Sequence, residues 1–145
     1  MDRFTTRFIQ VILGYEQMFL FWPKEEEREE ISKNNDDSHG FAGCVGFIDG
    51  SVIRLAYTPT WRHEEFFCHK QFYGINNLAI CDDKRKIRLF ESGFLGSSHD
   101  MKLLNDSNFV KTINDKVLND QYVLGDAGFS QCTYLVPVSK KSRNR

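Results

Sequence analysis

The sequence has no excess of basic residues over acidic residues. Lysine and arginine number 19 against 20 aspartate and glutamate residues, which gives a formal net charge of -1. A dedicated nucleic-acid-binding domain carries a strongly basic footprint, so any contact with DNA must be local. Basic residues cluster at 84–88 and 140–145, and runs of this kind are more often solvated loops and tails than binding patches.

Closely paired cysteines are also missing. The chain has four cysteines: Cys44, Cys68, Cys81 and Cys132. They form no CxxC pair and no spacing of the zinc-finger kind. Cys68 and His69 follow His63 closely, but without a second cysteine pair we interpret them as scattered residues and not as a metal cluster. We therefore expect reduced thiols in a protein of the nucleus or cytoplasm.

Long apolar runs are absent as well. No uninterrupted stretch reaches the roughly 18 residues that span a bilayer. The amino terminus shows no secretory pattern, because Gln10, Glu16 and Gln17 interrupt its apolar positions and no small-residue cleavage site follows. We expect neither secretion nor membrane insertion. No internal repeat suggests a solenoid or propeller.

The chain does contain enough apolar sequence for one core, since 41% of its 145 residues are hydrophobic. Apolar residues at three- and four-residue steps predict an amphipathic helix over 3–21, whose apolar face needs a partner. Residues 24–33 predict a short acidic helix that faces solvent, and residues 34–40 a polar linker. We therefore divide the chain into a lead-in at 1–40 and a domain at 41–145.

The second part alternates between strand and helix patterns. Residues 43–55 predict a strand, a tight turn at Asp49-Gly50 and a second strand. An antiparallel pair is predicted on either side of the turn at 82–84, ending near residue 94. Ser97-Ser98 before Asp100 is typical of a capped helix start. A further helix is predicted over 109–118, and strands over 121–124 and 134–137.

Two carboxylates, Asp49 and Asp126, stand at the ends of hydrophobic runs. Strands joined by a crossover helix can lie side by side, which would bring both acids to one sheet edge. Like charges at close range resist ionising together unless a cation lies between them, and carboxylate oxygens select Mg²⁺ or Mn²⁺. Each acid also has a simpler interpretation: Asp49 as a hairpin residue, and Asp126 as a turn residue or helix N-cap.

Five short sequence motifs follow one another along the chain: GFIDG at 46–50, HKQFYGIN at 69–76, AICD at 79–82, GSSHD at 96–100 and LGDAGF at 124–129. In this order they resemble the DDE domain of PIF/Harbinger-type transposases and Harbinger transposase-derived nucleases, from about residue 21 to residue 137. The resemblance implies an α/β, RNase H-like mixed sheet with flanking helices, preceded here by a short helical lead-in. It also implies metal-dependent phosphodiester cleavage and strand transfer on DNA.

The resemblance assigns roles to individual residues. Asp49 and Asp126 match the first two members of the acidic triad that binds Mg²⁺ or Mn²⁺. His99 and Asp100 match a His-Asp pair whose Asp is not the usual second triad member. We interpret Asp100 first as a charge that complements a helix start, and keep both residues as possible supporting residues of the site. His99 could orient a neighbouring group or contact DNA.

The sequence departs from the family pattern in two places. The third acid, a Glu on a later helix, has no counterpart, because no Asp or Glu follows Asp126. We therefore expect a C-terminally truncated, impaired nuclease that could use a DNA-binding partner protein. The alternatives are an inactive remnant that binds protein or DNA, or a partner chain that supplies the acid. Gln71 also stands where the family usually has Gly.

Overall fold

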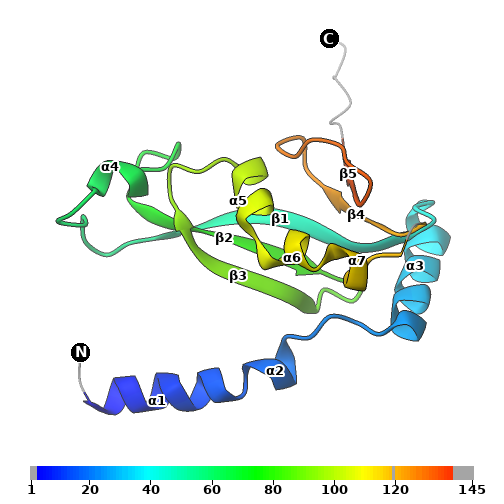
Figure 1. Cartoon of the computed structure of the whole chain (residues 1–145), viewed down its shortest axis with the longest axis horizontal. Helices are drawn as coiled ribbons and strands as arrows, with labels where there is room; N and C mark the ends of the chain where they lie inside the picture. The colour runs from blue at the N-terminus through cyan, green and yellow to red at the C-terminus, as the bar shows by residue number, and fades with distance from the viewer. Residues whose placement is uncertain (1–2, 119, 139–145) are drawn as a thin grey trace, which may run out of the picture.

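The computed structural model describes residues 3–118 and 120–138, and a five-stranded sheet forms its centre (Figure 1). The strands are β1 (Cys44–Arg54), β2 (Gly74–Cys81), β3 (Ile87–Leu95), β4 (Tyr122–Gly125) and β5 (Leu135–Pro137). Their order is β3-β2-β1-β4-β5. β1, β2 and β3 pair antiparallel, whereas β4 and β5 add in parallel on the other side of β1. This mixed sheet with flanking helices confirms the predicted α/β class and agrees with an RNase H-like fold.

The helices stand before, beside and between the strands. They are α1 (Arg3–Gly14), α2 (Glu16–Phe19), α3 (Glu25–His39), α4 (His63–Phe66), α5 (Asp100–Asp106), α6 (Asn108–Lys111) and α7 (Ile113–Lys116). α5 packs on β1 and β2 and continues into α6 (Figure 1). The buried cluster beneath them is Val45, Ile48, Leu78, Ile80, Leu104, Phe109, Val123, Phe129 and Leu135. The helix predicted over 109–118 is divided, because Thr112 leaves the helical region at φ -118° and ψ 20°.

The predicted turn at Asp49-Gly50 is wrong. β1 passes through both residues without interruption, with Asp49 opposite Ala79 and Gly50 opposite Leu78 on β2. The apolar runs on either side have high β-propensity, and a hairpin here would give up the ladder that β2 offers along the rest of β1. Asp49 is therefore a mid-strand residue.

The prediction for residues 24–40 is wrong in two respects. Residues 34–39, predicted as a linker, are the end of α3, which stops at Gly40 with a left-handed φ of +73°. α3 is also not fully solvated, because Arg28 and Asn35 are buried and bonded. Arg28 donates to the Gln121 side chain at 2.9 Å, and the Asn35 amide donates to the Cys44 carbonyl at 3.0 Å. Division of the chain at residue 40 stays a prediction.

The lead-in has the expected helical character but ends early, at Gly14, and resumes in α2. Neither α1 nor α2 contains a buried residue, and Phe4 and Phe8 are 84% and 64% exposed. No described residue buries the apolar face that was predicted to need a partner. Among the described residues, none of the helices has both the length and the apolar character that crossing a membrane requires.

The start of α5 differs from the serine cap that was predicted. His99 is the N-cap residue, and no side chain caps the helix. Ser98 instead belongs to the turn before it, where its N–H donates to the Leu95 carbonyl at 3.0 Å.

All four cysteines are free thiols, as predicted. The basic run at 140–145 lies outside the described residues.

Candidate active site

The end of β4 creates a notch beside β1. Pairing between these parallel strands ends where Ile48 lies opposite Gly125, while β1 continues to Arg54. Asp49 is the next residue of β1, and Asp126 directly follows the end of β4. Both side chains are exposed. Two acids that are far apart in the sequence therefore both follow the last paired residues of these adjacent strands.

One pocket of about 380 Å³ opens at this notch. Its lining residues are Asp49, Gly50, Val52, His69, Lys70, Asn76, Ser98, His99, Asp100, Asp126 and Gly128. All four residues singled out from the sequence, Asp49, His99, Asp100 and Asp126, are among them. We call Asp49, Asp100 and Asp126 the acidic notch.

Asp100 reaches the notch between two glycines. A Cβ added to Gly50 would lie 2.3 Å from Asp100 Oδ1, and one added to Gly128 would lie 2.6 Å from Asp100 Oδ2. A side chain at either position would therefore clash with the carboxylate in its present position and force it to move. Within the described chain, the Asp100 carboxylate takes part in no hydrogen bond, so its charge has no direct partner. The Asp100 side chain can therefore occupy this position only because Gly50 and Gly128 have no side chains.

The pKa of Asp100 is raised above its ordinary value, first by burial, and then by the negative charges of Asp126 and Asp49. His69 and His99 act in the opposite direction and lower it. The two other acids are thus close enough to repel Asp100 electrostatically. A cation at the notch would relieve this repulsion, since an opposite charge favours the ionised form of a carboxylate.

Asp126 is held by its own loop. The Gly128 N–H donates to Asp126 Oδ1 at 2.8 Å, and a Cβ on Gly128 would lie 3.0 Å from the same oxygen. This bond fixes one carboxylate oxygen and leaves Oδ2 free to bind a ligand. Asp126 is thereby presented toward Asp100 from the β4 side of the notch.

Asp49 approaches from a different direction. Side chains alternate along a strand, and the Gly50 position faces Asp100, so the Asp49 side chain leaves β1 on the opposite face while still lining the same pocket. In the part of the chain that the structure describes, no three His, Cys, Asp or Glu side chains form a ready-made metal site. The donors nevertheless suit Mg²⁺ or Mn²⁺ chemically, because Mg²⁺ commonly takes one or two carboxylates and keeps several waters.

The loop that carries His99 and Asp100 is tied to β2 by Asn76. Its amide donates to the carbonyls of Leu95, Gly96 and Ser98 at 3.0, 3.2 and 2.8 Å. Gly96 permits the loop to lie close to β2, since a Cβ there would lie 2.5 Å from the Gly74 carbonyl oxygen. The position of Asp100 therefore rests on buried polar contacts and not on a side-chain cap.

The sequence interpretation missed the basic side of the pocket, His69 and Lys70. Both stood in the HKQFYGIN block, but nothing local showed that this segment folds back beside the acids. Gly50 and Gly128 were missed too, although each follows a singled-out acid by one or two residues. Gln71 has a left-handed φ of +66°, the conformation for which the Gly usual in the family is suited.

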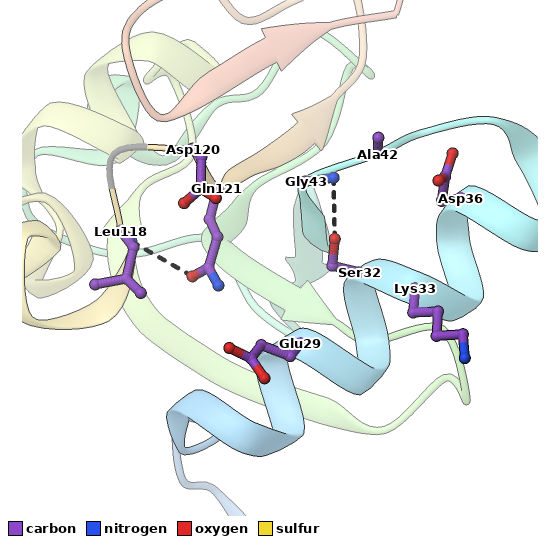
Figure 2. A pocket seen from close by; sticks show the side chains of 9 residues that line it. All are labelled: Glu29, Ser32, Lys33, Asp36, Ala42, Gly43, Leu118, Asp120 and Gln121. Carbon is purple, nitrogen blue, oxygen red and sulfur yellow. Dashed lines mark hydrogen bonds between the residues drawn. The ribbon is translucent and has the colours of Figure 1, made fainter.

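A second pocket, of about 500 Å³, lies between α3 and the segment before β4 and contains none of these residues (Figure 2). Its polar groups bond to one another: Gly43 N–H donates to the Ser32 hydroxyl at 2.9 Å, and Leu118 N–H to the Gln121 side chain at 3.4 Å. The first of these bonds joins α3 to the residue before β1. The acidic notch, which contains the residues singled out from the sequence, is therefore the candidate site.

Residues 48–145 match the family described as DDE superfamily endonuclease. The match covers more than half of the sequence, so this chain belongs to the DDE superfamily endonucleases. It is 25% identical over 139 residues to a protein of Rattus norvegicus and 22% identical over 139 residues to one of Homo sapiens, both named "Putative nuclease HARBI1".

These alignments cover 94% of this chain and 39% of each relative, so the chain spans about two fifths of the relatives' length. The predicted relationship to Harbinger transposase-derived nucleases is confirmed. No solved structure matches the chain significantly.

Proposed function

We propose that this chain acts as a DDE-type nuclease domain that cleaves phosphodiester bonds in DNA with Mg²⁺ or Mn²⁺ bound at the acidic notch. Membership of the endonuclease family supports the reaction class. The observation that carries the site is the position of Asp49 and Asp126, each directly after the last paired residues of adjacent parallel strands.

Asp49 and Asp126 would hold the metal through carboxylate oxygens. A divalent ion bound there supplies Lewis-acid stabilisation of the leaving oxygen and an activated water for phosphodiester cleavage. The Gly128 N–H keeps Asp126 oriented toward the pocket. Lys70 and His69, which line the same pocket, are suited to contact backbone phosphates of the substrate strand.

His99 is proposed as a supporting residue. It is exposed, lines the pocket and precedes the first residue of α5, where it can orient a neighbouring group or contact DNA. The net charge of -1 offers no general basic surface, so we propose that a separate DNA-binding protein helps to deliver the substrate. Access to DNA favours the nucleus, with the cytoplasm as the other proposed location.

Nicking of supercoiled plasmid by the purified chain tests the proposal. We expect nicking that requires Mn²⁺ or Mg²⁺ and falls at least about 100-fold in Asp49→Asn and in Asp126→Asn, because each substitution removes one charged ligand. Asp106→Asn is the matched control: Asp106 lies on α5, is exposed and pairs with Lys102 away from the pocket lining.

Nicking that persists in both ligand variants would reject the acidic notch as the site. Metal-independent retardation of DNA on a gel, without nicking, would favour the second candidate, an inactive domain that binds DNA. Neither cleavage nor binding would contradict both functions for this chain. Thermal unfolding of each variant, measured alongside, separates loss of the site from loss of the fold.

A further inference from the structure

Asp100 is the one member of the acidic notch that the family resemblance does not assign to the triad. Its position at the start of α5 gives it a simple structural interpretation, since an acid in the first turn complements the helix dipole. The surroundings of its carboxylate do not fit that role alone. Dipole complementation requires only proximity to the free N–H groups, whereas this side chain extends between Gly50 and Gly128.

The glycine contacts connect Asp100 directly to the two proposed ligands. Gly50 follows Asp49 in β1, and Gly128 is the residue whose N–H holds Asp126. All three atoms nearest to a Cβ on Gly50 belong to the Asp100 carboxyl group. The sequence thus leaves side-chain space next to each ligand, and the Asp100 carboxylate fills it on both sides.

The charged residues around the pocket also support a role for Asp100 beyond the helix start. Asp100 is partly buried beside Asp49 and Asp126, and the nearby basic residues His69, Lys70 and His99 stand around the same pocket without forming an ion pair with it. Three carboxylates in one pocket of about 380 Å³ are unfavourable in the absence of a cation. A divalent cation bound at this pocket would relieve the repulsion between the carboxylates.

We propose that Asp100 supplies the third negative charge of the divalent-cation site, acting from the glycine cradle formed by Gly50 and Gly128. This inference rests on the proposed function and deepens it. Asp100 is a positioning and charge-supplying residue, and it contacts the ion directly or through one of the waters that Mg²⁺ and Mn²⁺ retain. Loss of an outer-shell partner of this kind lowers metal affinity by about 10- to 100-fold.

Titration of the full chain with Mn²⁺, followed by the EPR signal of the free ion, measures this without an activity assay. We expect the dissociation constant to rise about 10- to 100-fold in Asp100→Asn. Asp106→Asn, on the same helix, should bind Mn²⁺ like the unsubstituted chain. Asp49→Asn and Asp126→Asn should weaken binding at least as much as Asp100→Asn, since they are the proposed direct ligands.

A double-mutant cycle tests the cradle itself. Gly50→Ala places a methyl group against the Asp100 carboxylate and should weaken Mn²⁺ binding by displacing it. In an Asp100→Ala background the same methyl group meets no carboxylate, so Gly50→Ala should have no additional effect. A full additional effect would mean that Gly50 acts through another group and would overturn the cradle.

The outcomes separate the two proposals. Unchanged Mn²⁺ affinity in Asp100→Asn, with loss in Asp49→Asn and Asp126→Asn, would overturn this inference and leave the proposed function in place. No Mn²⁺ binding by the unsubstituted chain, or equal binding by all variants, would overturn both. Circular dichroism confirms that each variant is folded, and removal of a repelling charge is not expected to unfold Asp100→Asn.

Discussion

Two groups of carboxylates in the described part of the chain differ in whether their negative charge is paired with a basic side chain. At the buried ion cluster, formed by Glu27, Asp82 and Arg88, the Arg88 guanidinium donates to Asp82 Oδ2 at 2.8 Å and also pairs with Glu27. Asp82 is only 2% exposed and accepts a second bond from the Lys86 N–H at 2.8 Å. At the acidic notch, three carboxylates share a pocket without an ion pair to any described residue.

The comparison distinguishes charge that stabilises the fold from charge that is available to a ligand. The buried ion cluster joins α3 to the end of β2 and to β3, and each of its two carboxylates is paired with the Arg88 guanidinium. The acidic notch leaves its charges unbalanced, which lowers stability in the absence of a cation. Uncompensated charge in a pocket is a physical indicator of a functional site, whereas compensated charge is mainly structural.

The largest expected effect comes from breaking the compensated cluster. Arg88→Met leaves Asp82 buried without its cation, so the free energy of unfolding should fall by about 3 to 5 kcal/mol. Urea denaturation followed by circular dichroism measures this change. The control is Lys84→Met, which breaks the exposed pair with Glu30 and should leave the unfolding midpoint unchanged. Equal stability of both variants would show that the two clusters do not differ as described.

Removal of a charge from the acidic notch should have the opposite sign. Asp100→Asn removes the burial cost of the charged carboxylate and its repulsion by Asp126 and Asp49, and should raise the free energy of unfolding at neutral pH when no metal is present. Thermal unfolding in the presence of a chelator reports this gain. A loss of stability in Asp100→Asn would instead indicate that Asp100 mainly stabilises the start of α5.

The smallest effect concerns the backbone beside the notch and leaves both clusters intact. Gln71 has a φ of +66°, which is unfavourable for a residue with a Cβ. Gln71→Gly removes that strain but gains freedom in the unfolded chain, so we expect a net stabilisation of about 0.5 kcal/mol. Lys70→Gly, one residue earlier and without a positive φ, should destabilise the protein. Matching losses in both would show that Gln71 is not strained.

Much of the sheet could be predicted from local patterns. The residues of β2, β3, β4 and β5 form short apolar runs bounded by polar turns, and these were placed within one or two residues. The prediction at Asp49-Gly50 was wrong although the pair does have a local preference for a turn. Its strand conformation depends on pairing with β2, a partner more than 20 residues away. Long-range pairing of this kind is not encoded in a short window.

The polar segments were the hardest to predict. Asn35 was predicted in a solvated linker, yet its side chain is 1% exposed because its amide satisfies the Cys44 carbonyl. At the notch, Asp49 and Asp126 were singled out first because each stands at the end of a hydrophobic run, and then because their motifs resemble a known family. The contribution of Gly50 and Gly128 could not be predicted. Both glycines matter because they lack a side chain where the Asp100 carboxylate lies, and this proximity is created only by the fold.

The central claim is that the acidic notch binds a divalent cation between β1 and the end of β4. The most direct measurement is the anomalous scattering of manganese in crystals grown with Mn²⁺. We predict an anomalous peak within coordination distance of the Asp49 and Asp126 carboxylates, and no such peak in Asp126→Asn crystals. An empty notch in well-diffracting crystals at millimolar Mn²⁺, or manganese bound only elsewhere on the molecule, would contradict the claim.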